Sequence, residues 1–114
     1  MKRVVVTGLG AITPVGNDVP AFWESLTQGK CGIDLITKFD TTEYRAKLAA
    51  EVKDFDPSLY MDKSEIRKND KFVQFAVAAS SQAVTDSGIQ GNVEPDRFGV
   101  YYCSGIVGFD TFVA

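Results

Sequence analysis

The residues of this chain best suited to covalent chemistry are two cysteines, Cys31 and Cys103. The 114 residues include no histidine, the commonest general base at neutral pH. Cys103 lies at the end of a predicted strand, beside Ser104 and Gly105, where an exposed thiol could act as a nucleophile. A reactive thiolate needs a neighbouring base, cation or helix N-terminus, and the sequence places no base clearly beside this one. We therefore expect a small buried cysteine at 103 and no catalytic residue in this chain.

Two glycines follow a run of valines near the N-terminus, an arrangement that also begins dinucleotide-binding motifs. Those motifs need a third glycine and then a helix, but Thr13 stands at the third glycine position and Pro14 follows it. Gly8-Leu9-Gly10 is therefore predicted to form a turn that permits close packing, in preference to a phosphate cradle. We therefore expect no cofactor. We also expect no metal site, since histidine, the commonest metal ligand, is absent.

Basic residues cluster in the middle of the chain, at Lys63, Arg67, Lys68 and Lys71, and three of them follow helical spacing. If a helix begins early enough, they form a cationic stripe that could dock an anionic partner. The alternative is an ordinary solvated helix face. The net charge of −3 gives no general attraction for nucleic acid or an anionic membrane, so neither is expected as a partner.

The elements that must position these residues alternate between strand and helix. Strands are predicted at 3–7, 48–52 and 97–103, and helices at 18–28 and from Ser64 or Lys68 to Ser87. Gly29 and Gly88 are expected to close the two helices, and residues 30–42 to form a loop. The order strand, helix, strand at the end of this series predicts a right-handed crossover between parallel strands of an α/β domain.

Length and composition limit the chain to one small domain. Apolar residues make up 45% of it and charged residues 24%, as in ordinary globular proteins. No apolar run is long enough for a signal-peptide core or a membrane span, so we expect a cytoplasmic protein with reduced thiols and no membrane insertion. Residues 106–114 lead into an element without a terminal signal, and residues 1–114 are therefore expected to be the truncated front of a larger domain.

Three segments stand out when the sequence is taken as a whole. They are Arg3-Val4-Val5-Val6-Thr7-Gly8-Leu9-Gly10 continuing through Pro14-Val15-Gly16-Asn17, then Arg67-Lys68-Asn69-Asp70-Lys71-Phe72-Val73-Gln74, then Ser104-Gly105-Ile106. In this order and spacing they resemble the N-terminal part of the β-ketoacyl-acyl-carrier-protein synthases, particularly the synthase II type. Shorter similarities between the segments extend the resemblance over nearly the whole chain.

The resemblance implies a thiolase-like fold, a layered α/β/α/β/α architecture of two similar halves, with this chain as most of the first half. It also implies a homodimeric acyltransferase of fatty acid biosynthesis. In that reaction an acyl group passes from acyl carrier protein to a cysteine, malonyl-carrier protein loses CO₂, and the resulting carbanion joins the acyl thioester. The family's cysteine and its two histidines lie beyond Ala114, so catalysis would require that missing part.

Two site roles for this chain follow from the resemblance. Arg67 and Lys68 match basic positions with which the family meets the acidic surface of acyl carrier protein, and Lys63 is expected to contribute as their neighbour. Ile106 matches a wall of the acyl pocket and would limit chain length. Cys103 and Val107 replace glycines of the family pattern Gly-Ser-Gly-Ile-Gly-Gly, which predicts an altered backbone path near that pocket.

Two other functions stay open at this point. A chain-length-factor-like subunit shares the fold and dimer interface of the synthases but lacks the nucleophile. The presence or absence of the catalytic cysteine and the two histidines in the rest of the protein would distinguish a synthase from a chain-length-factor-like subunit. An independent carrier-protein binding module would instead be a stable monomer formed by these residues alone, and the exposed apolar surface of an unfinished sheet argues against it.

Overall fold

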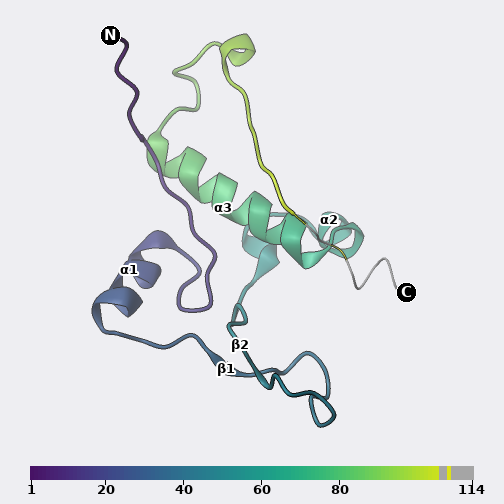
Figure 1. Cartoon of the computed structure of the whole chain (residues 1–114). Helices are drawn as coiled ribbons and strands as arrows, with labels where there is room; N and C mark the ends of the chain where they lie inside the picture. Colours follow the sequence, from purple (N-terminus) through teal and green to yellow (C-terminus); the bar gives the residue numbers. More distant parts are fainter. Residues whose placement is uncertain (106–107, 109–114) are drawn as a thin grey trace. The chain divides into compact units, whose positions relative to one another are not determined.

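The computed structural model of the chain describes residues 1–105 and residue 108 (Figure 1). The chain divides into two compact units. One unit is formed by residues 11–55, and the other by residues 1–10 together with the described residues from 56 onward. Ile106 and Val107 lie outside the described residues, so what the sequence predicts for them stays a prediction.

The unit of residues 11–55 contains the helix α1, Val19–Thr27. Asp18 precedes the helix in an extended conformation, and its Oδ1 accepts a hydrogen bond from the Ala21 N–H at 2.7 Å. This bond satisfies one of the N–H groups that a first helical turn leaves unpaired. Pro20 also occupies the first turn, where its missing N–H costs no hydrogen bond, and Gly29 follows the helix with a φ of +67°. The helix predicted in this stretch is confirmed.

The turn before α1 packs directly against that helix. Thr13 and Gly16 form a backbone bridge, with the Thr13 N–H donating to the Gly16 carbonyl at 2.9 Å. Ser25 is only 4% exposed, and its Oγ donates to the Val15 carbonyl at 2.7 Å. A Cβ at Gly16 would lie 2.7 Å from the carbonyl carbon of Ala21, so the approach requires glycine. A buried hydrogen bond and a close backbone contact therefore join this turn to α1.

A small antiparallel sheet completes the same unit. Its strands are β1, Asp34–Leu35, and β2, Leu48–Ala49, in the register Asp34 with Ala49 and Leu35 with Leu48. β2 confirms the beginning of the strand predicted at 48–52, whereas β1 lies in the stretch predicted to be a loop. A strand of two residues is too short to show a period-two pattern, which is why the sequence did not indicate it.

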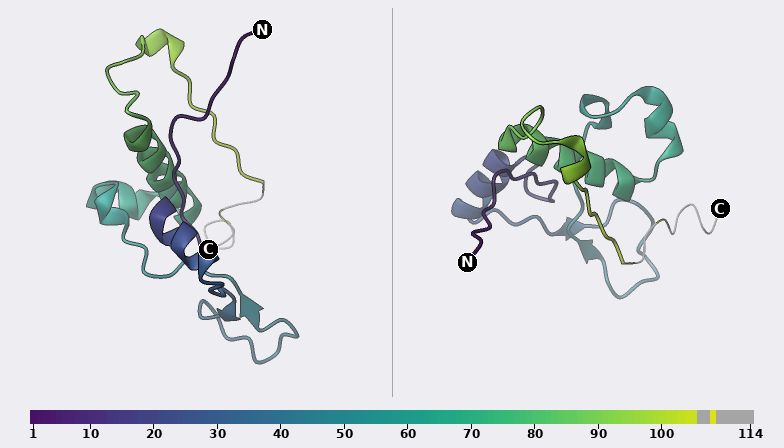
Figure 2. Two further views of the ribbon diagram at one scale, coloured as in Figure 1. Left: turned by 90° about the vertical axis from the view of Figure 1, so that its left-hand side faces the viewer. Right: turned by 90° about the horizontal axis from the view of Figure 1, so that it is seen from above.

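The other unit is built around the helix α3, Lys71–Ser87, which Gly88 closes in a left-handed conformation, as predicted. Before it the chain forms the 3₁₀ helix η1, Pro57–Leu59, and the helix α2, Lys63–Lys68. Figure 2 shows the segment that contains η1 and α2 beside α3. Of the two starts predicted for the long helix, Ser64 is wrong, because two helices occupy this stretch, whereas Lys68 lies three residues before the observed start of α3 at Lys71.

Asn69 separates these two helices. Its backbone is extended, with φ of −116° and ψ of 133°, so it cannot continue the helical hydrogen-bond pattern. Its backbone N–H still makes the last helical hydrogen bond, to the Glu65 carbonyl at 3.1 Å, and its side-chain amide donates to the same carbonyl at 2.9 Å. Asn69 therefore caps the end of α2, and its extended backbone turns the chain out of the helix before α3 begins.

Two glycines allow the N-terminal segment to lie against α3 (Figure 1). A Cβ at Gly8 would collide with the carbonyl oxygen of Ala83, and a Cβ at Gly10 would collide with that of Ala79. The helix backbone therefore fills the space beside both glycines. This confirms the predicted packing role of the Gly8-Leu9-Gly10 turn.

Two predicted strands are absent from the described part of the chain. Residues 3–7 and 97–103 form no strand pairing there, so the predicted crossover between parallel strands is also absent. Val4 is 93% exposed and Tyr101 is 95% exposed. A β-strand depends on hydrogen bonds from a neighbouring strand, and the described residues provide none for either segment. The short 3₁₀ helix η2, Pro95–Arg97, overlaps the second of these segments only at Arg97.

Candidate functional site

The helix α2 carries the basic residues that the sequence singled out. Asp62 caps this helix, since its Oδ1 accepts hydrogen bonds from the N–H groups of Ser64 and Glu65 at 2.8 and 2.9 Å. A six-residue helix has little stability of its own, so this cap matters for its formation. Lys63, Arg67 and Lys68 all lie on α2, and their side chains are exposed.

The three cations differ in their local bonding. Arg67 lies one turn after Lys63, and its Nε donates to the Lys63 carbonyl at 3.2 Å, which orients the guanidinium against the helix. Lys68 Nζ lies 3.8 Å from Glu65 Oε1 in an exposed ion pair. Lys71 belongs to α3, so the predicted stripe is interrupted between Lys68 and Lys71. The structure thus brings Lys63, Arg67 and Lys68 together on one short helix.

Two glutamines of α3 anchor the η1–α2 segment, and neither was among the residues predicted from the sequence. Gln74 Nε2 donates to the carbonyls of Ile66 and Asn69 at 3.1 and 2.8 Å. Eight residues later, Gln82 Nε2 donates to Tyr60 Oη at 2.8 Å. The only available sequence signal was the i, i+8 spacing of two long amide side chains on one face of the predicted helix.

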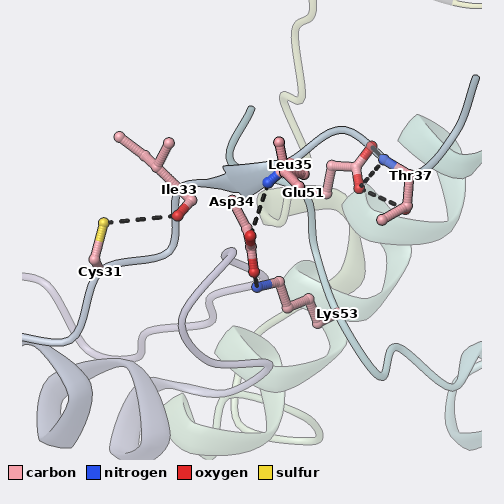
Figure 3. Close-up of polar contacts among 7 residues, drawn as sticks. All are labelled: Cys31, Ile33, Asp34, Leu35, Thr37, Glu51 and Lys53. Carbon is pink, nitrogen blue, oxygen red and sulfur yellow. Dashed lines mark hydrogen bonds and ion pairs between the residues drawn. The ribbon is translucent and has the colours of Figure 1, made fainter. Parts of the chain in front are cut away.

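The cysteines are exposed, which overturns the prediction of a buried thiol at 103. Cys103 lies in the segment that has no strand partner among the described residues, so nothing described covers it. Cys31 is also exposed, and its Sγ donates to the Ile33 carbonyl at 3.8 Å (Figure 3). Ile106, the residue expected to line an acyl pocket, lies outside the described residues.

A cavity of about 380 Å³ opens beside the β1–β2 sheet. Lys53 Nζ and Asp34 Oδ2 are 3.4 Å apart on its wall (Figure 3). Thr37 donates to Glu51 Oε2 through its N–H at 3.2 Å and through its Oγ1 at 2.7 Å. Both carboxylates are thus engaged in bonds that hold the two sides of the hairpin together, which favours a structural role for this cavity.

These bonds also change the acidity of the two carboxyls. The hydrogen bond from the Thr37 side chain lowers the pKa of Glu51 from its ordinary value of 4.5. The Leu35 backbone N–H, followed by Lys53, lowers the pKa of Asp34 from 3.8. A carboxyl with a lowered pKa in the folded state stabilises that state above its unfolded pKa, and this contribution is lost as pH falls through the folded pKa.

The hairpin is therefore expected to loosen in acid. Hydrogen exchange of the peptide that contains Thr37, corrected for intrinsic exchange rates, should show falling protection as pH drops below 4.5, because Glu51 becomes protonated. Glu51→Gln is the control: its protection should be lower above that pH and should lack this acid transition. An unchanged transition in Glu51→Gln would assign it to another group.

Within residues 1–105 and 108, no group of three or more His, Cys, Asp or Glu residues is arranged to hold a metal ion. None of the helices in that part of the chain has the length and apolar character required to cross a membrane.

Comparison with known proteins identifies the chain's family. Residues 1–112 match the family model described as "Beta-ketoacyl synthase, N-terminal domain". Proteins named 3-oxoacyl-[acyl-carrier-protein] synthase 2 are 46% identical over 112 residues in Staphylococcus aureus strain COL, 48% over 108 in Coxiella burnetii and 45% over 108 in Synechocystis. These matches cover 94–97% of this chain but only 26–27% of the relatives, so the chain spans about a quarter of their length.

A solved structure is similar as well. The structure titled "The ishigamide ketosynthase/chain length factor" matches with a TM-score of 0.68 and 34% sequence identity, and the match covers 83% of this chain and 23% of that one. The similarity in sequence and in structure thus extends over most of the chain. The chain belongs to the β-ketoacyl synthase family, and it corresponds to the N-terminal domain of that family.

Proposed function

We propose that the protein containing these residues is a 3-oxoacyl-acyl-carrier-protein synthase that lengthens acyl chains in fatty acid biosynthesis. The observation that carries this proposal is the 45–48% identity, over nearly the whole chain, to proteins of that name from three different bacteria. We further propose the thiolase-like layered architecture and a homodimer for the complete protein. Residues outside the described part of this chain would supply the partners that segments 3–7 and 97–103 need to form strands.

The proposed reaction consists of two successive acyl transfers. A cysteine thiolate takes the acyl group from acyl carrier protein and releases the carrier's thiol. Malonyl-carrier protein then loses CO₂, and the carbanion that remains attacks the acyl-cysteine thioester, which frees the cysteine and forms the 3-oxoacyl product on the carrier. The present residues contain no histidine, so the two histidines expected for this chemistry would come from elsewhere in the protein. No catalytic role is assigned to Cys31 or Cys103.

The role proposed for the present residues is to receive the carrier protein. Lys63, Arg67 and Lys68 are exposed on α2, where they would attract and orient an acidic carrier surface. The ion pair between Lys68 and Glu65 is exposed to solvent and therefore weak, so all three cations remain available to a partner. Ile106 is proposed, from the family resemblance alone, to limit the length of the acyl chain.

A second candidate function is a non-catalytic, chain-length-factor-like partner subunit. It is favoured by the similarity to a structure whose title names a ketosynthase and a chain length factor. Both kinds of protein would use the present residues as scaffold and docking surface. A synthase has the nucleophilic cysteine, whereas the partner subunit lacks it. Under either proposal, the present residues do not contribute this nucleophile.

The deciding experiment is a condensation assay on the complete protein encoded by the gene that contains these residues. Purified protein is mixed with acyl-carrier protein and malonyl-carrier protein, and mass spectrometry follows the carrier-bound products. A 3-oxoacyl-carrier protein longer by two carbons, together with CO₂, supports the synthase. Product only after addition of a separate ketosynthase subunit supports the partner subunit instead, and no product in either case rules out both.

A further inference from the structure

One face of α3 is covered by the η1–α2 segment. Gln74, Ala78 and Gln82 are spaced at i, i+4 and i+8, which places them along a single face of the helix. Gln74 is 4% exposed and Ala78 is fully buried at 0%. Ala78 lies between the two glutamines on this face, and both glutamines donate hydrogen bonds to the segment.

The two glutamines hold different parts of this segment. Gln82 bonds to Tyr60, which immediately follows η1 and precedes α2. Gln74 bonds to the carbonyls of Ile66 and Asn69, which bracket Arg67 and Lys68 in the last turn of α2. Gln82 therefore anchors the beginning of the segment, whereas Gln74 anchors the turn that carries two of the three basic residues.

The chemistry of the contact determines how the Gln74 amide is oriented. Both of its partners are carbonyl oxygens, which only accept hydrogen bonds, so the NH₂ group must face them. The Oε1 atom of Gln74 is buried without a donor among the described residues. A side chain of the same shape that lacks the NH₂ group would therefore leave two carbonyls of the α2 terminus without this donor.

We propose that Gln74 is a positioning residue for carrier-protein recognition: its amide sets the orientation of the last turn of α2 and thereby places Arg67 and Lys68 for the incoming partner. This inference rests on the proposed function, since it requires that α2 receives a carrier protein. Electrostatic recognition of a folded acidic partner depends on where the charges lie as well as on how many there are. Loss of the Gln74 contact would leave the charges in place but change their arrangement.

The test compares Gln74→Met with Gln82→Met in the complete encoded protein. Each substitution keeps the side-chain length and removes the donated hydrogen bonds, but only Gln74→Met affects the turn that bears Arg67 and Lys68. Steady-state kinetics are measured with acyl groups carried on acyl carrier protein and, separately, on a small pantetheine thioester. Gln74→Met should raise KM for the carrier-protein substrate roughly tenfold, with kcat and the pantetheine KM unchanged. Gln82→Met should raise the carrier-protein KM by less than about threefold, because its hydrogen bond reaches Tyr60, which precedes α2, and leaves the turn with Arg67 and Lys68 in place.

Other outcomes separate failure of this inference from failure of the proposed docking site. The charge-reversed variant K63E/R67E/K68E serves as the reference. If that variant raises the carrier-protein KM and Gln74→Met does not, the positioning role is wrong while the docking site stands. If neither variant raises it, the docking site itself is wrong. A Gln74→Met variant that loses kcat, or that raises both KM values equally, has a general structural defect, and the positioning role is again rejected.

Hydrogen exchange provides a readout that does not depend on activity. Peptides covering residues 62–70 should exchange faster in Gln74→Met than in Gln82→Met, while peptides from α1 exchange at the same rate in both variants. Equal exchange of residues 62–70 in the two variants would overturn the proposal even where both are inactive.

Discussion

Replacing Gly10 by alanine is expected to lower the melting temperature of the complete encoded protein by roughly 4 °C, because a protein about four times as long as this chain has a large entropy of unfolding. The added Cβ would collide with the Ala79 carbonyl oxygen and would lie 2.9 Å from the backbone nitrogen of Ala83. Backbone atoms of a helix cannot rotate away as a side chain can, so the N-terminal segment would have to move from α3, at a cost of about 3 kcal/mol. This movement would also strain the hydrogen bond from the Leu9 N–H to Asp86 Oδ2, which is 2.9 Å long.

The matched control for this prediction is Gly29→Ala. Gly29 has a φ of +67°, and a Cβ there would meet no described atom within 4 Å. Its substitution therefore costs only the left-handed backbone strain of a non-glycine residue, about 1 kcal/mol. Differential scanning fluorimetry of both variants measures the difference. Equal shifts for the two would show that the contact between Gly10 and α3 is not what makes glycine necessary.

Reversing the charges of α2 is expected to reduce kcat/KM for carrier-protein substrates roughly 100-fold at low ionic strength. The K63E/R67E/K68E variant turns three attractive charges into repulsive ones on an exposed helix. Because exposed charges are screened by salt, the defect should shrink as ionic strength rises towards about 1 M. Stopped-flow or steady-state kinetics over a salt series, with a pantetheine thioester as the second substrate, measures both effects.

A second triple variant tests whether location matters. K2E/K30E/K38E changes the net charge by the same amount, and all three residues are exposed but lie outside α2. It should reduce kcat/KM less than about threefold. Equal losses in the two triple variants would mean that the overall charge of the protein governs the encounter, and the assignment of α2 as the docking surface would then fall.

Local chemistry made several elements predictable from the sequence. The start and end of α1 follow from Asp18, Pro20 and Gly29, and the end of α3 follows from Gly88, because capping depends on residues within one or two turns. The packing role of Gly8 and Gly10 was also predictable, since the motif around them fails as a nucleotide site. In each case the deciding interaction lies within a few residues of the signal or depends on glycine itself.

The errors concern interactions that depend on distant residues. Segments 3–7 and 97–103 have the composition of strands, but a strand exists only when a partner is present, and the described residues provide none. The break at Asn69 is of another kind: the contacts around it, with Glu65 and Gln74, are local, but they are made by side-chain amides, which helical periodicity does not report. The same limit applies to the site. The basic residues were predictable from charge spacing, whereas the glutamines that hold their helix were not.

The arrangement around α3 has a consequence for changing the partner preference of such a protein. The N-terminal segment contacts α3 through Ala79 and Ala83, whereas the η1–α2 segment is clasped to it through Gln74 and Gln82. Because these attachments use different residues of one helix, residues 57–69 can be exchanged without changing the contacts between the N-terminal segment and α3. If α2 receives the carrier protein as proposed, exchanging this stretch while keeping Gln74, Gln82 and Tyr60 should change the carrier preference without redesign of the fold.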